Sequence, residues 1–396
     1  MSSSDWSFLL PELLQTIARK LFLLADFIRF RAVCTSWRLA TPDIPIHLQF
    51  PWLMLSQSIH NSNRRAFITF SNKLHYLNFP EATYPRRRRG SSHGWVAILD
   101  ESPTIFLINP LTRAKINLPP LSSFPNIIHF DFSNVGREYT LRLFQTSDID
   151  LPVSLCEMRD SFISKIVLSN SPSRGSPFVA LAIIGKWGVL AYCKSDQNSW
   201  NLIEEARYFC EDVTFMNGLI YGLHKSGAIA VCDISGDSPA VRIIGNPETM
   251  VLGGVDMRYL LNAMGELLMV TRFIVLAAGI EPEEELRYTT IKFQVFTFNF
   301  SGSRWERLMN LGDKVLFLGE NASLALSASD YPGCRGNRIY FTDDFSEEDF
   351  SGIHGEHDTG IFNLDDGIFE PLPSCPQDSR SRLLWPSPVW ITPNPC

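Results

Sequence analysis

The sequence predicts an α+β chain of two parts: a small all-α module, followed by an all-β domain built as a β-propeller of six or seven blades. Up to about Thr41, apolar residues follow helical spacing. After Pro45, they come in short runs rich in Val, Ile, Phe, Tyr and Trp, separated by turn residues. A weak pattern of glycine, strand, turn, strand and tryptophan then recurs about every 40–50 residues, a period typical of kelch-like propeller blades. We place the domain boundary between residues 42 and 43.

The N-terminal module is predicted to begin with a helix that has one apolar face. Pro11 suits the first turn of this helix, where its missing N–H costs nothing. A second short helix is expected to begin around Asp26, whose carboxylate can cap the segment 27–33. Pro42 and Pro45 are expected to end helical structure. The apolar residues of the first helix recur at steps of three and four: Leu10, Leu13, Leu14, Ile17, Ala18 and Leu21.

The β domain is predicted from short apolar runs bounded by Gly, Asn, Asp and Pro. Two pairs of segments repeat: 217–221 resembles 336–340, and a turn leads into tryptophan at both 197–200 and 302–305. We expect Trp95, Trp200 and Trp305 to lie in blade cores. The expected strands include 95–99, 104–108, 189–193, 219–223, 229–233, 267–272, 293–300 and 338–342.

Composition excludes several classes of protein. The chain has 396 residues, of which 45% are hydrophobic and 19% charged, values that fit a globular protein and not a disordered one. A net charge of −7 argues against a nucleic-acid partner. The eight cysteines form no CxxC pair, so neither a disulfide framework nor a zinc framework is expected. We expect no cofactor.

The sequence also gives an expected location. Residues 1–5 lack the basic start of a signal peptide. The longest apolar stretch, 178–193, is broken by Lys186 and is too short to span a membrane. We therefore expect a soluble protein of the nucleus or cytoplasm with no membrane partner.

The N-terminal module resembles the F-box, and the β domain resembles the propeller-like domain that follows the F-box in a large plant family. The F-box match combines Leu-Pro at 10–11, Glu-Leu-Leu at 12–14, Val-Cys at 33–34 and Trp-Arg at 37–38, with Ile17, Leu21, Asp26 and Arg29 at the family's spacing. The propeller match lies in the strings 90–95, 109–113, 212–218, 265–272, 326–334 and 339–344.

This resemblance implies a non-catalytic substrate receptor of a Skp1–cullin–F-box ubiquitin ligase. The F-box would bind a Skp1-type protein, which connects the receptor to cullin, and the propeller would hold an unidentified target protein. Trp37, as a large aromatic, is the best candidate for an interface hot spot. In the alternative interpretation, the same residues only seal the module against the propeller. The implied Skp1-binding residues are Leu10, Pro11, Leu13, Leu14, Ile17, Leu21, Val33, Cys34 and Trp37.

Two other functions remain open at this stage. The propeller could be a small-ligand binder or an enzyme with a vestigial F-box, its site formed by Asp330, Asp343 and Asp344. The chain could also be an interaction scaffold that binds Skp1 without cullin.

Two polar segments have alternative interpretations. The run Arg86 to Arg89 could be a nuclear-import signal or an anion-binding segment. Its flanking residues Pro85 and Gly90 instead favour a solvated loop. His354, Glu356 and His357 have side chains that can bind a metal, but their Ser- and Gly-rich surroundings favour an exposed loop.

Overall fold

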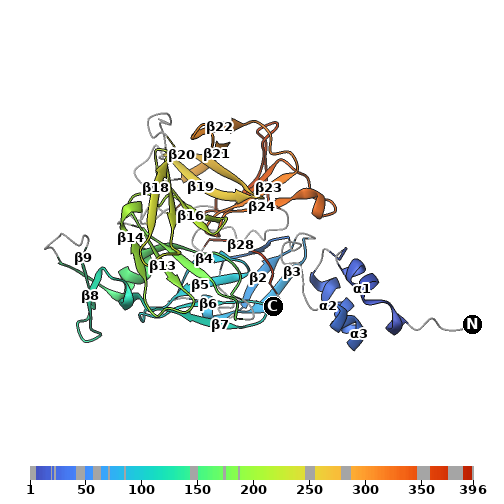
Figure 1. Cartoon of the computed structure of the whole chain (residues 1–396), viewed down its shortest axis with the longest axis horizontal. Helices are drawn as coiled ribbons and strands as arrows, with labels where there is room; N and C mark the ends of the chain where they lie inside the picture. Colours follow the sequence, from blue (N-terminus) through green and yellow to red (C-terminus); the bar gives the residue numbers. More distant parts are fainter. Residues whose placement is uncertain are drawn as a thin grey trace, which may run out of the picture.

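A small group of helices lies beside a much larger β domain (Figure 1). This arrangement confirms the predicted fold class. The computed structural model describes residues 6–18, 20–21, 24–41, 50–56, 64–69, 72–83, 86–142, 150–172, 175–185, 188–245, 255–277, 287–345, 357–372 and 387–394. The boundary predicted at residue 42, with Pro42 and Pro45, lies outside these residues.

The helical module consists of the short 3-10 turn η1 (Trp6–Phe8) and three helices, α1 (Pro11–Ala18), α2 (Leu24–Ala32) and α3 (Thr35–Ala40). α1 begins at Pro11, as predicted. The second helix, predicted to begin around Asp26, is α2, which begins at Leu24, so Asp26 is not its N-cap. Asp26 therefore lies in the first turn, where it pairs with Arg29 at 2.9 Å. The module has its own small core, formed by the buried side chains Leu14, Ala18, Phe27 and Phe30.

The described strands form seven sheets, and six of these surround a common centre as propeller blades. The innermost strands of the six blades line one central cavity. The first blade consists of β4 (Arg87–Ser92), β5 (Trp95–Leu99), β6 (Ile105–Ile108) and β7 (Lys115–Leu118), and the second of β11 (Ile163–Leu168), β12 (Val179–Ile184), β13 (Val189–Lys194) and β14 (Asn201–Ile203). The third consists of β15 (Val213–Met216), β16 (Leu219–Leu223), β17 (Ile229–Asp233) and β18 (Ala240–Ile244). The fourth consists of β19 (Val255–Ala263), β20 (Glu266–Ala277), β21 (Arg287–Asn299) and β22 (Arg304–Leu308).

The fifth blade departs from simple up-and-down order. Its strands lie in the order β24-β23-β25-β26-β27, and β23 pairs with β25 in parallel. β24 therefore folds back to become the innermost strand. The two segments of the predicted repeat, 217–221 and 336–340, therefore occupy different positions in their blades. β16 is the second strand from the centre of the ring, and β25 is the third. The strands are β23 (Lys314–Leu318), β24 (Leu324–Ser327), β25 (Arg338–Phe341), β26 (Gly360–Asn363) and β27 (Phe369–Glu370).

The sixth blade joins the two ends of the domain and closes the ring. The C-terminal strand β28 (Val389–Ile391) pairs with β1 (Trp52–Met54), so that Trp52 faces Ile391. β2 (Arg64–Ile68) and β3 (Leu74–Asn78) complete the sheet. The innermost strand of this blade therefore comes from the far end of the sequence.

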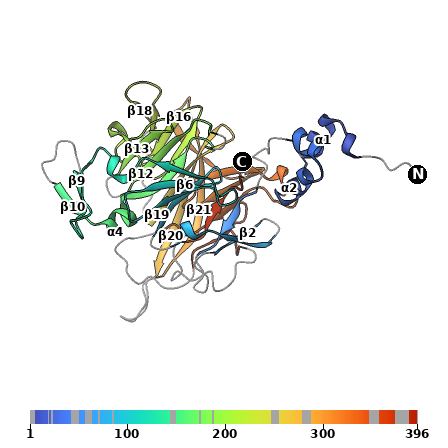
Figure 2. The same ribbon diagram turned by 90° about the horizontal axis from the view of Figure 1, so that it is seen from below.

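The seventh sheet lies outside the ring. β8 (Ile127–Phe130), β9 (Tyr139–Arg142) and β10 (Asp150–Val153) are inserted between the first two blades and project from the domain (Figure 2). Buried residues such as Tyr139 and Leu141 join this sheet to the core shared by the two blades. The short helix α4 (Leu155–Glu157) leads back into β11.

Two of the predicted core tryptophans perform the same task in different blades. Trp200 is buried, and its Nε1 donates to the carbonyl of Pro119, in the preceding blade, at 2.9 Å. Trp305 is half-buried, and its Nε1 donates to the carbonyl of Gly227, again in the preceding blade, at 2.6 Å. Trp95 is buried in the core of the first blade. The indole N–H groups of Trp200 and Trp305 thus each satisfy a carbonyl across a blade interface while their rings pack in the core.

The inner strand β4 approaches its neighbours closely at Gly90, which has a φ of +102°. A Cβ at this position would lie 2.9 Å from the Ile166 carbonyl oxygen and 3.1 Å from the Glu320 carbonyl oxygen. Gly218 also has a positive φ, of +78°, but a Cβ there would have no atom within 4 Å.

We expect Gly90→Ala to destabilise the domain by about 1–3 kcal/mol more than Gly218→Ala. Both variants carry the strain of a left-handed residue, but only Gly90→Ala also pushes apart inner strands of the ring. Urea unfolding of the two variants measures the difference. Equal losses would show that the ring has room at Gly90.

Candidate functional site

The helical module exposes many large apolar side chains although its own core is complete. On α1, Leu14 and Ala18 face the core, whereas Leu13 and Ile17, with Leu10 just before the helix, form a second stripe; Leu10, Leu13 and Ile17 are 63%, 49% and 40% exposed. Val33, at the end of α2, is 59% exposed. An exposed apolar surface of this kind is typical of a protein interaction site.

The structure separates the nine residues implied to bind Skp1. Leu10, Pro11, Leu13, Ile17 and Val33 are exposed, whereas Leu21, Cys34 and Trp37 are half-buried and Leu14 is buried. Sequence reasoning did not assign three further exposed residues, Trp6, Phe8 and Leu39. They lie outside both the apolar stripe of the first helix and the F-box pattern, the two signals from which the nine residues were inferred.

Trp37 holds the module together. Its ring centroid lies 4.4 Å from that of Phe30, and its Nε1 donates to the carbonyl of Trp6 at 3.0 Å. The indole thus links α2, α3 and η1. Trp52 of β1 and Leu111, in the turn after β6, also pack against the module's core. The module is therefore in contact with the propeller.

The arginine run lies inside the ring, not in a solvated loop as its flanks predicted. Arg87 to Arg89 belong to β4, the innermost strand of its blade. Arg86 pairs with Asp100 at 2.8 Å, and Arg87 pairs with Asp160 at 2.7 Å. Arg88 is 3% exposed; it pairs with Glu320 at 2.7 Å and donates to the carbonyl of Ser387. Arg89 donates to the carbonyls of Arg159 and Asp160. The run ties the first blade to the second, fifth and sixth.

A buried carboxylate joins four blades across the centre of the ring. Asp212 is 1% exposed and pairs with Lys165 of β11 at 2.9 Å. It also accepts from the backbone N–H of Leu260 at 3.1 Å and from the Ser323 hydroxyl at 2.8 Å. Lys165 and Asp212 line a cavity of about 370 Å³, and Ser323 lines another of about 530 Å³. These contacts, together with the close approach at Gly90, separate the channel into two cups.

The two cups differ in charge. The cup of about 370 Å³, at the starts of the inner strands, contains charged side chains of both signs; we call it the charged cup. Its carboxylates Asp160, Glu320 and Asp344 have arginine partners. The cup of about 530 Å³, at the ends of the same strands, is lined by Ser, Thr, Asn and apolar residues and His93; we call it the neutral cup.

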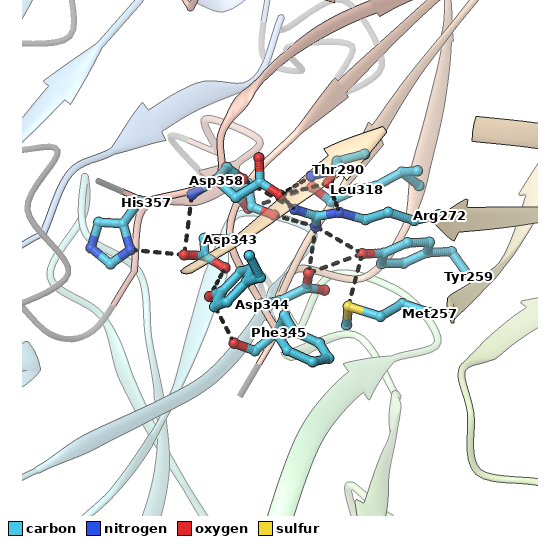
Figure 3. A network of polar contacts seen from close by, with 12 residues as sticks. Met257, Tyr259, Arg272, Thr290, Leu318, Asp343, Asp344, Phe345, His357 and Asp358 are labelled. Carbon is cyan, nitrogen blue, oxygen red and sulfur yellow. Dashed lines mark hydrogen bonds and ion pairs between the residues drawn. The ribbon is translucent and has the colours of Figure 1, made fainter. Parts of the chain in front are cut away.

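Arg272 is the centre of a buried polar network beside the charged cup (Figure 3). The guanidinium is fully buried between Asp344 and Asp358, with N–O distances of 3.0 and 3.1 Å. It also donates to the hydroxyl of Thr290 at 2.7 Å and to the carbonyl of Thr342 at 2.9 Å. Burial alone would lower its pKa, but Tyr259 and the carboxylates raise it above the usual value. Arg272 is therefore charged at every physiological pH.

Burial has the opposite effect on its partner. Because burial disfavours the charged carboxylate, the pKa of Asp344 rises to about 6 although Arg272 lies beside it. The Tyr259 hydroxyl, 2.9 Å away, is the other contact of this carboxylate. The network joins β19, β20, β21 and the segment after β25, which makes it a structural link within and between two blades.

A histidine lies between a serine and an aspartate in the same region. His357 Nδ1 is 3.2 Å from Asp343 Oδ2, and His357 Nε2 is 3.3 Å from Ser56 Oγ. This is the order of groups in a serine hydrolase triad, and sequence reasoning missed it because Ser56 lies 301 residues from His357. Ser56, His357 and Asp343 are all buried. Because Ser56 follows β1 and the other two side chains lie between β25 and β26, these contacts link the fifth and sixth blades.

These contacts also bear on the polar sites considered from sequence. Asp343 and Asp344 lie in the buried network, but Asp330 is exposed on a separate turn, so the three do not form one site. The expectation that His357 lies in an exposed loop is wrong, because it is 6% exposed and bonded to Asp343. His354 and Glu356 lie outside the described residues. Within the described part of the chain, no three His, Cys, Asp or Glu side chains gather as metal ligands.

The helices are too short or too polar to cross a membrane in the part of the chain that the structure describes.

Comparisons with known proteins agree with this architecture. The chain is 28% identical to F-box protein SKIP23 of Arabidopsis thaliana, with 98% of this chain and 96% of the relative covered. It is 25% identical to F-box protein At2g17036 of the same plant, over 98% of this chain and 95% of the relative. These relatives confirm the predicted resemblance to plant F-box proteins with a propeller domain.

A family model described as the KIB1-4 beta-propeller matches residues 66–363. The match runs from β2 to β26 and so includes strands of all six blades. Because it covers well over half of the sequence, the chain belongs to the KIB1-4 β-propeller family.

Proposed function

We propose that this protein is the substrate-recognition subunit of a Skp1–cullin–F-box ubiquitin ligase. Its helical module binds a Skp1-type protein, cullin is reached through that protein, and the propeller holds a target protein. The carrying observation is the apolar surface of the module. Leu10, Leu13, Ile17 and Val33 are exposed, whereas Leu14, Phe27 and Phe30 already form the module's core. The F-box names of the relatives support this assignment.

Such a subunit makes and breaks no bond. It raises the effective concentration of the target beside a ubiquitin-carrying enzyme. This role needs two separate binding surfaces on one rigid body. The contacts of Trp52 and Leu111 with the module's core support such rigidity. We place this activity in the nucleus or cytoplasm.

Replacing Leu13 and Val33 together with glutamate is expected to reduce capture of a Skp1-type protein at least about thirtyfold, which corresponds to roughly 2 kcal/mol. Both side chains are exposed, so the charges leave the module's core intact but would have to be buried in the interface. Co-purification of the full-length chain with a Skp1-type protein measures the change.

The matched control is Ile243→Glu on β18, which is 58% exposed on the propeller and should bind like the wild type. If the wild-type chain captured no Skp1-type protein, the docking role would be wrong. Equal capture by the double variant would move the interface to other residues. Adding cullin to the captured complex then separates a ligase subunit from a scaffold that uses Skp1 alone.

A further inference from the structure

The neutral cup is unusual in its chemistry. Among the residues that the structure describes, the 18 that line it include no Asp, Glu, Lys or Arg, whereas eight of the 17 around the charged cup are of these types. The wall alternates hydroxyl and amide groups, such as Thr214 and Asn262, with apolar surface, such as Phe215 and Leu326. A ligand in this cup therefore meets hydrogen-bonding groups without formal charge.

Three tight hairpins of one geometry follow the inner strands β4, β15 and β19, whose last residues line this cup. Each has two successive residues with positive φ: His93 and Gly94, Asn217 and Gly218, and Met264 and Gly265. This geometry favours Asn followed by Gly. Asn217 follows the rule, but His93 and Met264 occupy the Asn position of the other two turns. Both side chains are exposed, and Met264 is 58% exposed.

The Met264 side chain does not stabilise the turn in which it lies. Its side chain offers no local hydrogen bond to offset the left-handed backbone, as asparagine would. Strained backbone positions of this kind are enriched at binding sites. Methionine is also an adaptable contact residue at binding surfaces. The strain is therefore explained if the exposed side chain at the cup mouth touches a partner.

We propose that the neutral cup receives an extended, uncharged segment of the target protein, and that His93 and Met264 at its mouth contact that segment. The proposal rests on the function proposed above, in which the propeller holds a target. The target thus enters the channel at the neutral cup, and the bound segment carries no charged side chain. The cup's volume suits a few residues, and its wall offers donors and acceptors to a peptide backbone.

The wall also determines what the cup rejects. A charged side chain entering it would lose water and find no opposite charge in return. A phosphate on serine or threonine would add about 1.5 to 2 negative charges to the segment, with no arginine among the described wall residues to receive them. Binding is therefore restricted to the unmodified segment.

A library of random nonapeptides displayed on phage, selected on the immobilised full-length protein, tests the proposal. The selected peptides should be depleted in Asp, Glu, Lys and Arg at their central positions. A synthetic peptide of the selected set should bind at least fivefold more weakly to the double variant His93→Asn, Met264→Asn, and tenfold more weakly when its central serine or threonine is phosphorylated. The melting temperature of the variant should be unchanged or higher, because asparagine suits both turns.

The matched control is Met309→Asn, which removes a methionine that is 67% exposed just after β22, the outermost strand of the blade that holds Met264, and should leave binding unchanged. Selection of charged peptides, equal binding by the double variant, or no selection at all would overturn the proposal. Capture of a Skp1-type protein by the same preparation depends on the helical module alone. A failed selection with intact capture would therefore reject the cup and leave the adaptor role standing.

Discussion

Replacing Arg272 with methionine is expected to lower the free energy of unfolding by about 3–5 kcal/mol. The guanidinium is fully buried and pairs with both Asp344 and Asp358. Removing the cation leaves two carboxylates in surroundings that already raise the pKa of Asp344 to about 6. These carboxylates must then either stay charged without a partner or bind protons, and both cost free energy at pH 7.

Urea unfolding at pH 7 measures this loss of stability. Two further variants serve as a control and as a partial rescue. Arg304→Met removes an exposed arginine that pairs with Glu306 and should cost less than about 1 kcal/mol. Adding Asp344→Asn and Asp358→Asn to Arg272→Met removes the stranded charges and should recover part of the loss. A cost below 1 kcal/mol for Arg272→Met alone would show that the network contributes little to the fold.

The fold could be predicted from the sequence where the signal is local. The expected strand at 95–99 is β5, that at 219–223 is β16 and that at 229–233 is β17. Apolar runs between turn residues define such strands whatever lies beside them. The helix that begins at Pro11 was predictable for the same reason, because its spacing and its first-turn proline lie within a few residues.

Features that depend on distant partners could not be predicted. Arg88 looks like a loop residue in sequence, but its carboxylate partner Glu320 lies 232 residues away. The contact of His357 with Ser56 spans 301 residues. The inward turn of β24 is equally hidden, because only its neighbours across the ring make it an inner strand. No single-sequence pattern records such pairings.

In the candidate docking surface, too, the local sequence pattern predicts one part and the packing decides the rest. Helical spacing places Leu13 and Leu14 on the apolar side of α1 but does not separate them. The structure does, because Leu14 is 1% exposed among Phe27 and Phe30 while Leu13 is 49% exposed. Periodicity therefore predicts the apolar side of a helix, but only packing decides which part of it is left for a partner.

Ending the chain before Ser387 is expected to abolish the folded propeller. The deletion removes β28, which supplies the innermost strand of the sixth blade. Trp390 of this strand packs against Phe317 of the fifth blade, with ring centroids 5.2 Å apart, and its carbonyl accepts from the hydroxyl of Ser91 in the first. Loss of a buried tryptophan alone typically costs about 3–5 kcal/mol, and here an inner strand between two blades is lost as well.

Size-exclusion chromatography and circular dichroism of the truncated chain test this expectation, with a chain that ends at Asn394 as the matched control. The control keeps β28 and the bond from the Asn394 side chain to the His93 carbonyl, so it should remain compact. A compact truncated chain that unfolds cooperatively would show that five blades suffice. Closure matters for function because β1, the strand that pairs with β28, begins at Trp52, which contacts the helical module. The strand that locks the ring therefore also fixes the propeller's orientation relative to the surface proposed to bind Skp1.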